Sequence, residues 1–235
     1  HTGVRVLPID IGVACDITGQ KIIRRKIAYG TKDMTQKAAM TREQCVQALE
    51  IGIEMAQKCK DDGDQITAVG EMGIGNTTST AAVTSVLTGY APADVTGRGA
   101  GLSSDGLARK ISAIEQAIAR NRPDPTDPID VLSKVGGFDI AGITGFYLGA
   151  AANRMPIVAD GVITAAAALC AVRLCPAVRD YIIFSHESKE PAGKLLLDAL
   201  HVQPFITAGM RLGEGTGAVA AIALLDLAFS VYNEM

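Results

Sequence analysis

The runs MPIVAD (residues 155–160) and YIIFSH (residues 181–186) indicate the fold of this chain. Each is a short apolar stretch that ends in polar residues. A central strand of a parallel sheet has this character because helices bury it on both faces. The run QITAVGEMG (65–73) shares it, and VRVLPIDIGV (4–13) is expected to form a further buried strand.

Helical patterns alternate with these strands. The first, TREQCVQALEIGIEMAQKCK (41–60), begins with Thr41 and Gln44 at the spacing of a capping box. The alternation predicts an α/β fold with a doubly wound, mostly parallel, Rossmann-like sheet and helices on both faces. We see no internal repeat or linker, so residues 1–235 are expected to form a single domain. Further helices are expected at 76–89, 106–121, 190–201 and 215–232, with a surface excursion at the Pro-rich segment 123–128.

Composition restricts the class of protein. Hydrophobic residues make up 48% of the 235 and charged residues 20%, which argues against disorder. The net charge of −3 argues against nucleic acid as the main partner. The five cysteines have no CxxC spacing and no His-rich cluster beside them, so we expect no metal site, and free thiols suit a cytoplasmic protein. The apolar stretches are short and interrupted, so no membrane span is expected.

Glycine-rich and polar loops follow the strands. The carboxyl ends of parallel strands meet at one edge of a sheet, where ligands bind. Glycine lets backbone N–H groups approach a phosphate closely. Lys110 and Ser188, with the backbones of Gly73 and Gly99, could therefore hold one phosphomonoester. The loops concerned are GEMGIGNTTS (70–79), VTGRGAGLSSDGLARK (95–110), ADGVITAAA (159–167), SHESKEPAGK (185–194) and GMRLGEGTGA (209–218).

Each of these residues also has a simpler interpretation. The GRGAG segment could be a tight turn, Lys110 a solvated helix residue, and His186 a loop residue. Ser188 and Asp160 could each cap the helix that follows. Glu71 and Glu214 lie in glycine-rich loops, where an acid can stabilise a helix start. Two acids facing one crevice, however, favour a catalytic role over stabilisation of a helix start.

Five of these motifs, GEMGIGNTTSTAA, VTGRGAGLSSDGLARK, MPIVADGVITAAAAL, SHESKEPAGKLLL and GMRLGEGTGAVAA, resemble those of the nicotinate-nucleotide–dimethylbenzimidazole phosphoribosyltransferase family. The resemblance runs from about residue 4 to the C-terminus in the family's order. It implies transfer of phosphoribose from nicotinate mononucleotide to 5,6-dimethylbenzimidazole in cobalamin biosynthesis, without metal or cofactor, by a homodimer. It also implies that Glu214 is the general base and Glu71 an acid near the ribose.

The resemblance implies binding roles for further residues. Gly73, Gly99, Lys110 and Ser188 would bind the phosphate. Asp160, Leu212 and Gly213 would contact the substrates.

One departure from the family pattern leaves alternatives open. The family's chains carry an N-terminal helical segment before the first strand seen here, so the small helical subdomain is expected to be incomplete. An inactive phosphate-binding or assembly domain therefore remains an alternative. A transferase with a purine or phenolic acceptor is another.

Overall fold

The computed structural model describes residues 2–19, 21–99 and 101–235. Its elements in chain order are β1 (Ile9–Asp10), β2 (Ile23–Arg24), α1 (Arg42–Asp61), β3 (Thr67–Val69), α2 (Thr77–Thr88), α3 (Pro92–Val95), α4 (Ser104–Asn121), α5 (Pro128–Val135), α6 (Phe138–Ala152), β4 (Ile157–Ala159), α7 (Val162–Leu174), the 3-10 helix η1 (Pro176–Tyr181), β5 (Ile182–Phe184), α8 (Ala192–Leu200) and α9 (Thr216–Glu234).

The centre of the fold is a three-stranded parallel sheet in the order β3-β4-β5. Val158 of β4 lies opposite Ala68 of β3 and Ile183 of β5. These three residues face the first turns of α9, where they surround the buried Ala218 and Ala221. One face of the sheet is therefore covered by the start of the last helix.

The other face of the sheet belongs to the main core. Ile157 and Ala159 of β4 point into it, together with residues of α1, α6 and α7. Helices thus cover both faces of a parallel sheet, which confirms the predicted fold class. The strands at 65–73, 155–160 and 181–186 are shorter than expected but lie where the sequence predicted them.

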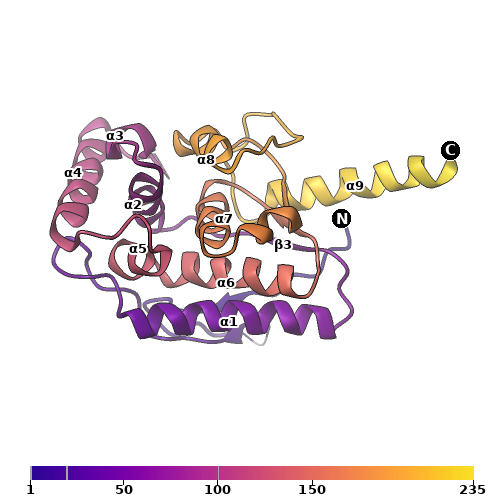
Figure 1. The fold of residues 1–235 in the computed structure, drawn as a ribbon, viewed down its shortest axis with the longest axis horizontal. Helices are drawn as coiled ribbons and strands as arrows, with labels where there is room; N and C mark the ends of the chain where they lie inside the picture. The colour runs from indigo at the N-terminus through magenta and orange to yellow at the C-terminus, as the bar shows by residue number, and fades with distance from the viewer. Residues whose placement is uncertain (1, 20, 100) are drawn as a thin grey trace.

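Helices α1 and α6 lie side by side along one edge of the molecule (Figure 1). Glycines allow this close approach. A Cβ on Gly145 of α6 would overlap the backbone oxygen of Leu49 in α1, and one on Gly52 of α1 would overlap the backbone oxygen of Gly142. Helix α6 is apolar on all sides, which is typical of a buried helix. Our expectations from the sequence omitted α5 and α6, because α6 lacks an amphipathic period.

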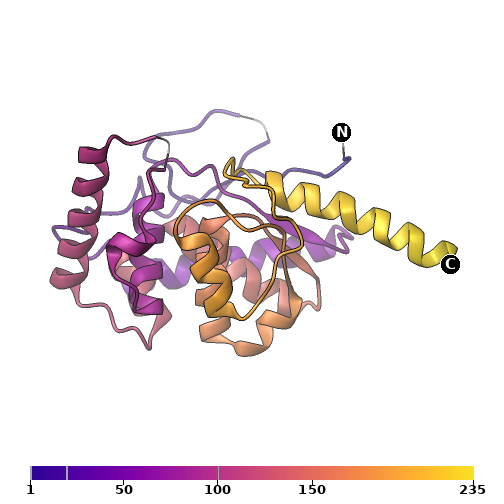
Figure 2. The same ribbon diagram turned by 90° about the horizontal axis from the view of Figure 1, so that it is seen from above.

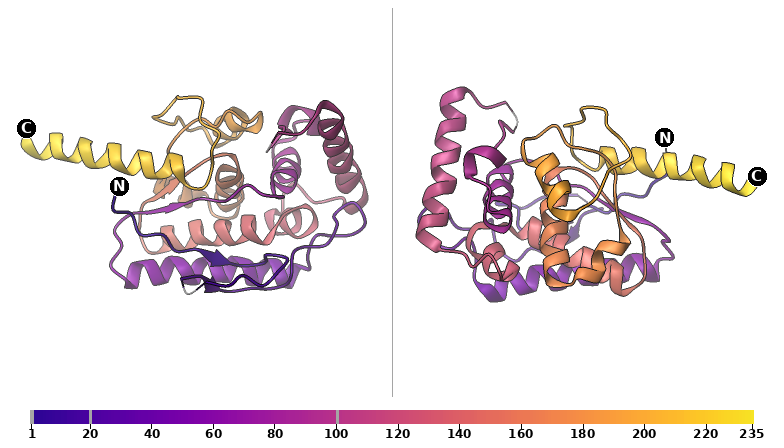
Figure 3. Two further views of the ribbon diagram at one scale, coloured as in Figure 1. Left: turned by 180° about the vertical axis from the view of Figure 1, so that it is seen from behind. Right: turned by 45° about the horizontal axis from the view of Figure 1, so that its top comes forward.

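The expectation that residues 4–13 form a buried strand of the main sheet is wrong. Only Ile9–Asp10 are extended, and they pair with Ile23–Arg24 in a separate two-stranded sheet. Seen from behind, this part of the chain runs along α1 (Figure 3). Val6 is 78% exposed. An apolar run does not specify its pairing partner, and Pro8 has no N–H to donate to a ladder.

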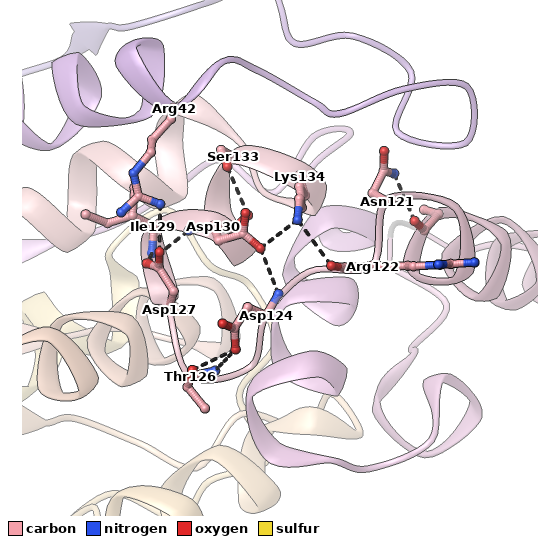
Figure 4. Close-up of polar contacts among 11 residues, drawn as sticks. Arg42, Asn121, Arg122, Asp124, Thr126, Asp127, Ile129, Asp130, Ser133 and Lys134 are labelled. Atoms are coloured by element: carbon pink, nitrogen blue, oxygen red, sulfur yellow. Dashed lines mark hydrogen bonds and ion pairs between the residues drawn. The ribbon is translucent and has the colours of Figure 1, made fainter.

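The expected helix boundaries agree closely with α1, α2, α4, α8 and α9. Thr41 caps α1 in a full capping box with Gln44, as predicted. The Pro-rich turn before α5 is exposed at Asp124 and held by a network of carboxylates (Figure 4). Asp127 accepts from the N–H groups of Ile129 and Asp130 and pairs with Arg42 at 2.7 Å.

Helix α9 extends away from the rest of the molecule (Figures 1 and 2). Beyond Ala221 its large side chains are mostly exposed; Leu227 is 64% and Phe229 61% exposed. The helix is long and apolar enough to cross a membrane, with a mean hydropathy of 1.4 over a window that is 22% buried. Helices that pack into protein interiors share this length and composition.

Candidate active site

The loops after the three parallel strands converge on one cavity of about 190 Å³. Glu71 follows β3, Asp160 follows β4 and His186 follows β5. The loop between α8 and α9 completes the wall. The lining residues are Glu71, Met72, Gly73, Ile74, Thr77, Gly99, Asp160, Gly161, Val162, Ile163, Thr164, His186, Ser188, Glu190, Arg211, Leu212 and Gly213.

Glu71 is a partly buried acid in the cavity wall. Its Oε2 accepts a hydrogen bond from the Gly73 N–H at 2.5 Å. Burial raises the pKa of the Glu71 carboxyl above its ordinary value, and the Gly73 N–H opposes this shift. Glu71 is therefore a carboxyl group whose proton affinity is increased by its surroundings.

Glu214 is joined to Glu71 through the backbone. Its N–H donates to the Glu71 carbonyl oxygen at 2.9 Å. Glu214 has φ 58°, and Gly213 and Gly215 on either side are also left-handed. Its side chain is exposed, beside the lining residues Leu212 and Gly213. The structure thus joins the backbones of both predicted acids, and of the two only Glu71 is a cavity-lining residue.

Asp160 has a role that the sequence did not indicate. The residue is 5% exposed. Its Oδ2 accepts from the Gly215 N–H at 3.1 Å, and its Oδ1 accepts from Gly217 at 2.8 Å and Ala218 at 3.1 Å. The suggestion that it caps the helix after its own strand is wrong, because it caps α9. It lines the cavity, but both carboxylate oxygens are engaged by amides; contact with substrate stays a prediction.

Lys110 is buried behind the cavity wall. Its Nζ donates to the Thr77 hydroxyl at 2.8 Å and to the Gly97 carbonyl at 3.2 Å. At 8% exposure it is not a solvated helix residue, so that alternative is wrong. Burial lowers the pKa of its ammonium, and Glu190 opposes this. The cation lies behind Thr77 and Gly99, which line the cavity, and is not itself a lining residue.

Ser188 lies at the cavity and is 8% exposed. It does not cap a helix, since α8 begins at Ala192 after Pro191 with no side-chain cap. Gly73 and Gly99 also line the cavity, and both have positive φ. The predicted anion-binding residues are therefore gathered at one cavity, with Lys110 just behind them.

Sequence reasoning missed several lining residues. Thr77 receives the Lys110 hydrogen bond, and Arg211 and Glu190 contribute charge. His186 was assigned to an ordinary loop, yet it is 5% exposed and lines the cavity. Its position directly after a strand was a signal that could have identified it.

Potential metal ligands are dispersed across the described part of the chain. Within it, no group of three or more His, Cys, Asp or Glu side chains is placed to hold a metal ion. All five cysteines are free thiols. Burial raises the pKa of the Cys45 thiol to about 12 and that of Cys59 to about 11, so both remain protonated at neutral pH.

Comparisons with known proteins agree with this arrangement. A family model described as Phosphoribosyltransferase matches residues 1–235. Nicotinate-nucleotide–dimethylbenzimidazole phosphoribosyltransferases of Geobacter metallireducens and Roseiflexus sp. are 49% and 50% identical over the whole chain, which covers 67% of each relative. The crystal structure of CobT from Thermus thermophilus superimposes with a TM-score of 0.89 at 39% identity, over 94% of this chain and 66% of that one.

The chain thus spans about two thirds of the length of the relatives it matches. The match extends over all its motifs, and each of the five motifs contributes residues to the strand-end cavity or to its wall. The chain belongs to the nicotinate-nucleotide–dimethylbenzimidazole phosphoribosyltransferase family.

Proposed function

We propose that this protein transfers the 5-phosphoribosyl group of nicotinate mononucleotide to 5,6-dimethylbenzimidazole. The products are α-ribazole 5′-phosphate and nicotinate. The observation that carries the proposal is the backbone contact between Glu214 and Glu71, which lines a cavity that also gathers anion-binding groups. The relatives named for this reaction support it.

The reaction is a displacement at C1′ of the ribose. One ring nitrogen of the acceptor base attacks C1′, and the bond to the pyridinium nitrogen breaks with its electron pair going to nicotinate. The leaving group is cationic before it departs, so it needs no protonation. The acceptor's other ring nitrogen loses its proton, for which Glu214 is the proposed base.

The cavity supplies the remaining contacts. Gly73, Gly99, Ser188 and, behind them, Lys110 are proposed to hold the 5′-phosphate. Three exposed apolar side chains at the rim suit an aromatic ring: Met72, Ile74 and Leu212 are 65%, 78% and 70% exposed. Holding both substrates in line lowers the entropic part of the barrier.

The test is product formation from nicotinate mononucleotide with a panel of acceptors. We expect release of nicotinate with benzimidazoles and much less with purines or phenols. Binding of the mononucleotide without turnover on any acceptor would instead favour a phosphate-binding domain. A homodimer in the cytoplasm is part of the proposal, and the exposed apolar side of α9 supports the dimer.

A further inference from the structure

His186 lies in the cavity wall, and the proposed reaction does not use it. Its Nδ1 lies 3.0 Å from the Ser185 hydroxyl oxygen. Its Nε2 makes no hydrogen bond within residues 2–19, 21–99 and 101–235. An imidazole at this position offers one ring nitrogen to whatever the cavity holds.

The neighbours of His186 determine which nitrogen carries the proton. The Ser185 hydroxyl donates to the Asp160 carbonyl oxygen at 3.1 Å, and a carbonyl can only accept. With its single proton used, the Ser185 oxygen accepts from His186, so Nδ1 is protonated. Burial lowers the pKa of His186, and the weaker opposing effect of the Asp160 charge does not reverse this. The neutral ring therefore leaves Nε2 as a bare acceptor.

The ring is held in this orientation by close packing against α9. A Cβ on Gly217 would overlap Nδ1 and lie 3.0 Å from Asp160 Oδ1. A Cβ on Gly161 would lie in ordinary contact, 3.8 Å from both Cε1 and Nε2. Gly161 and His186 both line the cavity, and the edge of the ring next to Gly161 is the Cε1–Nε2 edge.

A bare acceptor nitrogen selects a donor group. The phosphate and the nicotinate carboxylate carry only acceptors when ionised, so within the donor nucleotide only the ribose hydroxyls can donate. We propose that His186 Nε2 accepts a hydrogen bond from a ribose hydroxyl of nicotinate mononucleotide, so that the site distinguishes ribose from deoxyribose. This inference rests on the proposed function and deepens it.

The proton position can be measured without any ligand. Nitrogen-15 spectra of the three histidines report which ring nitrogen is protonated, and the His186→Phe variant identifies the His186 signals. We expect Nδ1 protonated and Nε2 bare at pH 7. A protonated Nε2 would overturn the inference.

Binding measurements test the hydroxyl contact. Calorimetry would compare nicotinate mononucleotide with its 2′-deoxy and 3′-deoxy forms. For the parent protein, loss of the contacted hydroxyl should weaken binding roughly two- to tenfold. His186→Phe should weaken the intact nucleotide by a similar factor and abolish the difference from that deoxy form.

Two further variants support the comparison. Ser185→Ala removes the hydroxyl that orients the ring but keeps the ring, and should reduce the discrimination between the nucleotide and its deoxy form. It therefore tests the contact even if His186→Phe does not fold. His201→Asn changes an exposed histidine at the end of α8 and should have no effect. Equal weakening of all three nucleotides by His186→Phe refutes the inference while leaving the proposed function intact. Failure of the parent to bind the mononucleotide would refute both.

Discussion

Glu214 holds a left-handed backbone conformation that costs a non-glycine residue on the order of 1 kcal/mol. Gly213 and Gly215 adopt the same region without that cost. Glycine would suit this turn better than glutamate does. The glutamate at this strained position therefore indicates a function for its carboxylate. The hydrogen bond from its N–H to Glu71 fixes the turn at the cavity rim.

Changing Glu214 should separate activity from stability. We expect Glu214→Gln to lower turnover by roughly 10²–10⁴, since a general base is lost. Glu214→Gly should lose as much activity but gain about 1 kcal/mol in the free energy of unfolding, because the strain is relieved. Steady-state kinetics and urea denaturation measure the two effects. Near-parental turnover of Glu214→Gln at saturating substrate would contradict the base assignment.

Lys110 should act on the phosphate and not on the rest of the nucleotide. Its Nζ is held by Thr77 and Gly97 next to Gly99. We expect Lys110→Met, which keeps the apolar stem, to weaken nicotinate mononucleotide at least tenfold while leaving the unphosphorylated riboside nearly unchanged. Calorimetry with both compounds measures this.

The exposed Lys194 provides the control for Lys110, because it pairs with Asp198 on the surface of α8. Lys194→Met should bind both compounds like the parent. Equal losses for nucleotide and riboside in Lys110→Met would mean that Lys110 only supports the fold.

At the scale of elements, the start of α9 is fixed by a carboxylate from another part of the chain. Asp160 accepts three backbone hydrogen bonds from the amides at this helix start, where the helix dipole favours a negative charge. The same contacts position the turn that carries Glu214. Asp160 therefore links the end of β4 to the proposed base.

We expect Asp160→Asn to destabilise the protein by about 1–3 kcal/mol, because the charge is lost and an amide N–H can face the α9 amides. Turnover should fall more than affinity for the mononucleotide, since the Glu214 turn loosens. Thermal denaturation and kinetics together test this. A fall in affinity alone, at unchanged stability, would support direct substrate contact instead.

The contact between α1 and α6 should tolerate a methyl group at one glycine and not at another. Gly145→Ala would place Cβ on the Leu49 backbone, so we expect a loss of about 1–3 kcal/mol despite the better helix propensity of alanine. A Cβ on Gly142 would overlap the end of the Ile11 side chain, at 2.7 Å, and lie in ordinary contact with the Ala48 backbone oxygen, at 3.8 Å. Thermal denaturation of this matched variant, Gly142→Ala, should therefore show a clearly smaller loss of stability than Gly145→Ala. Equal unfolding temperatures for Gly145→Ala and Gly142→Ala would contradict this, because they would show that α1 and α6 can move apart without loss of stability.

At the scale of the whole molecule, α9 presents apolar side chains that the described residues bury fully only near Ala218 and Ala221. Exposed apolar surface of this extent is typical of an interaction site. A second copy of the chain is the proposed partner.

We expect a dimer by light scattering, and a monomer after the double change Leu227→Glu and Phe229→Glu, because charges are excluded from an apolar interface. Ser230→Glu with Asn233→Glu introduces the same charge on the same helix at positions that are polar in the parent. If this control double variant is also monomeric, the added charge and not the loss of the apolar face would be responsible for dissociation. A monomeric parent would contradict the dimer.

The sequence alone determined the local features of this protein. Apolar runs located the three strands of the central sheet, and the capping box located the start of α1. Because parallel strands end at one edge, the loops after them identified Glu71 and Ser188 as neighbours of one cavity. These features depend on side-chain periodicity and turn chemistry, which residues adjacent in the sequence determine.

Only the tertiary structure decided the long-range pairings. Asp160 bonds to amides that follow it by 55 or more residues, and Lys110 is buried against Thr77, 33 residues away. The segment 4–13 pairs outside the main sheet, and the Ser185 hydroxyl, which donates to the Asp160 carbonyl, lies beside His186 Nδ1. Such outcomes depend on which surfaces pack together, and a polar group's partner follows from that packing and not from its neighbours in sequence.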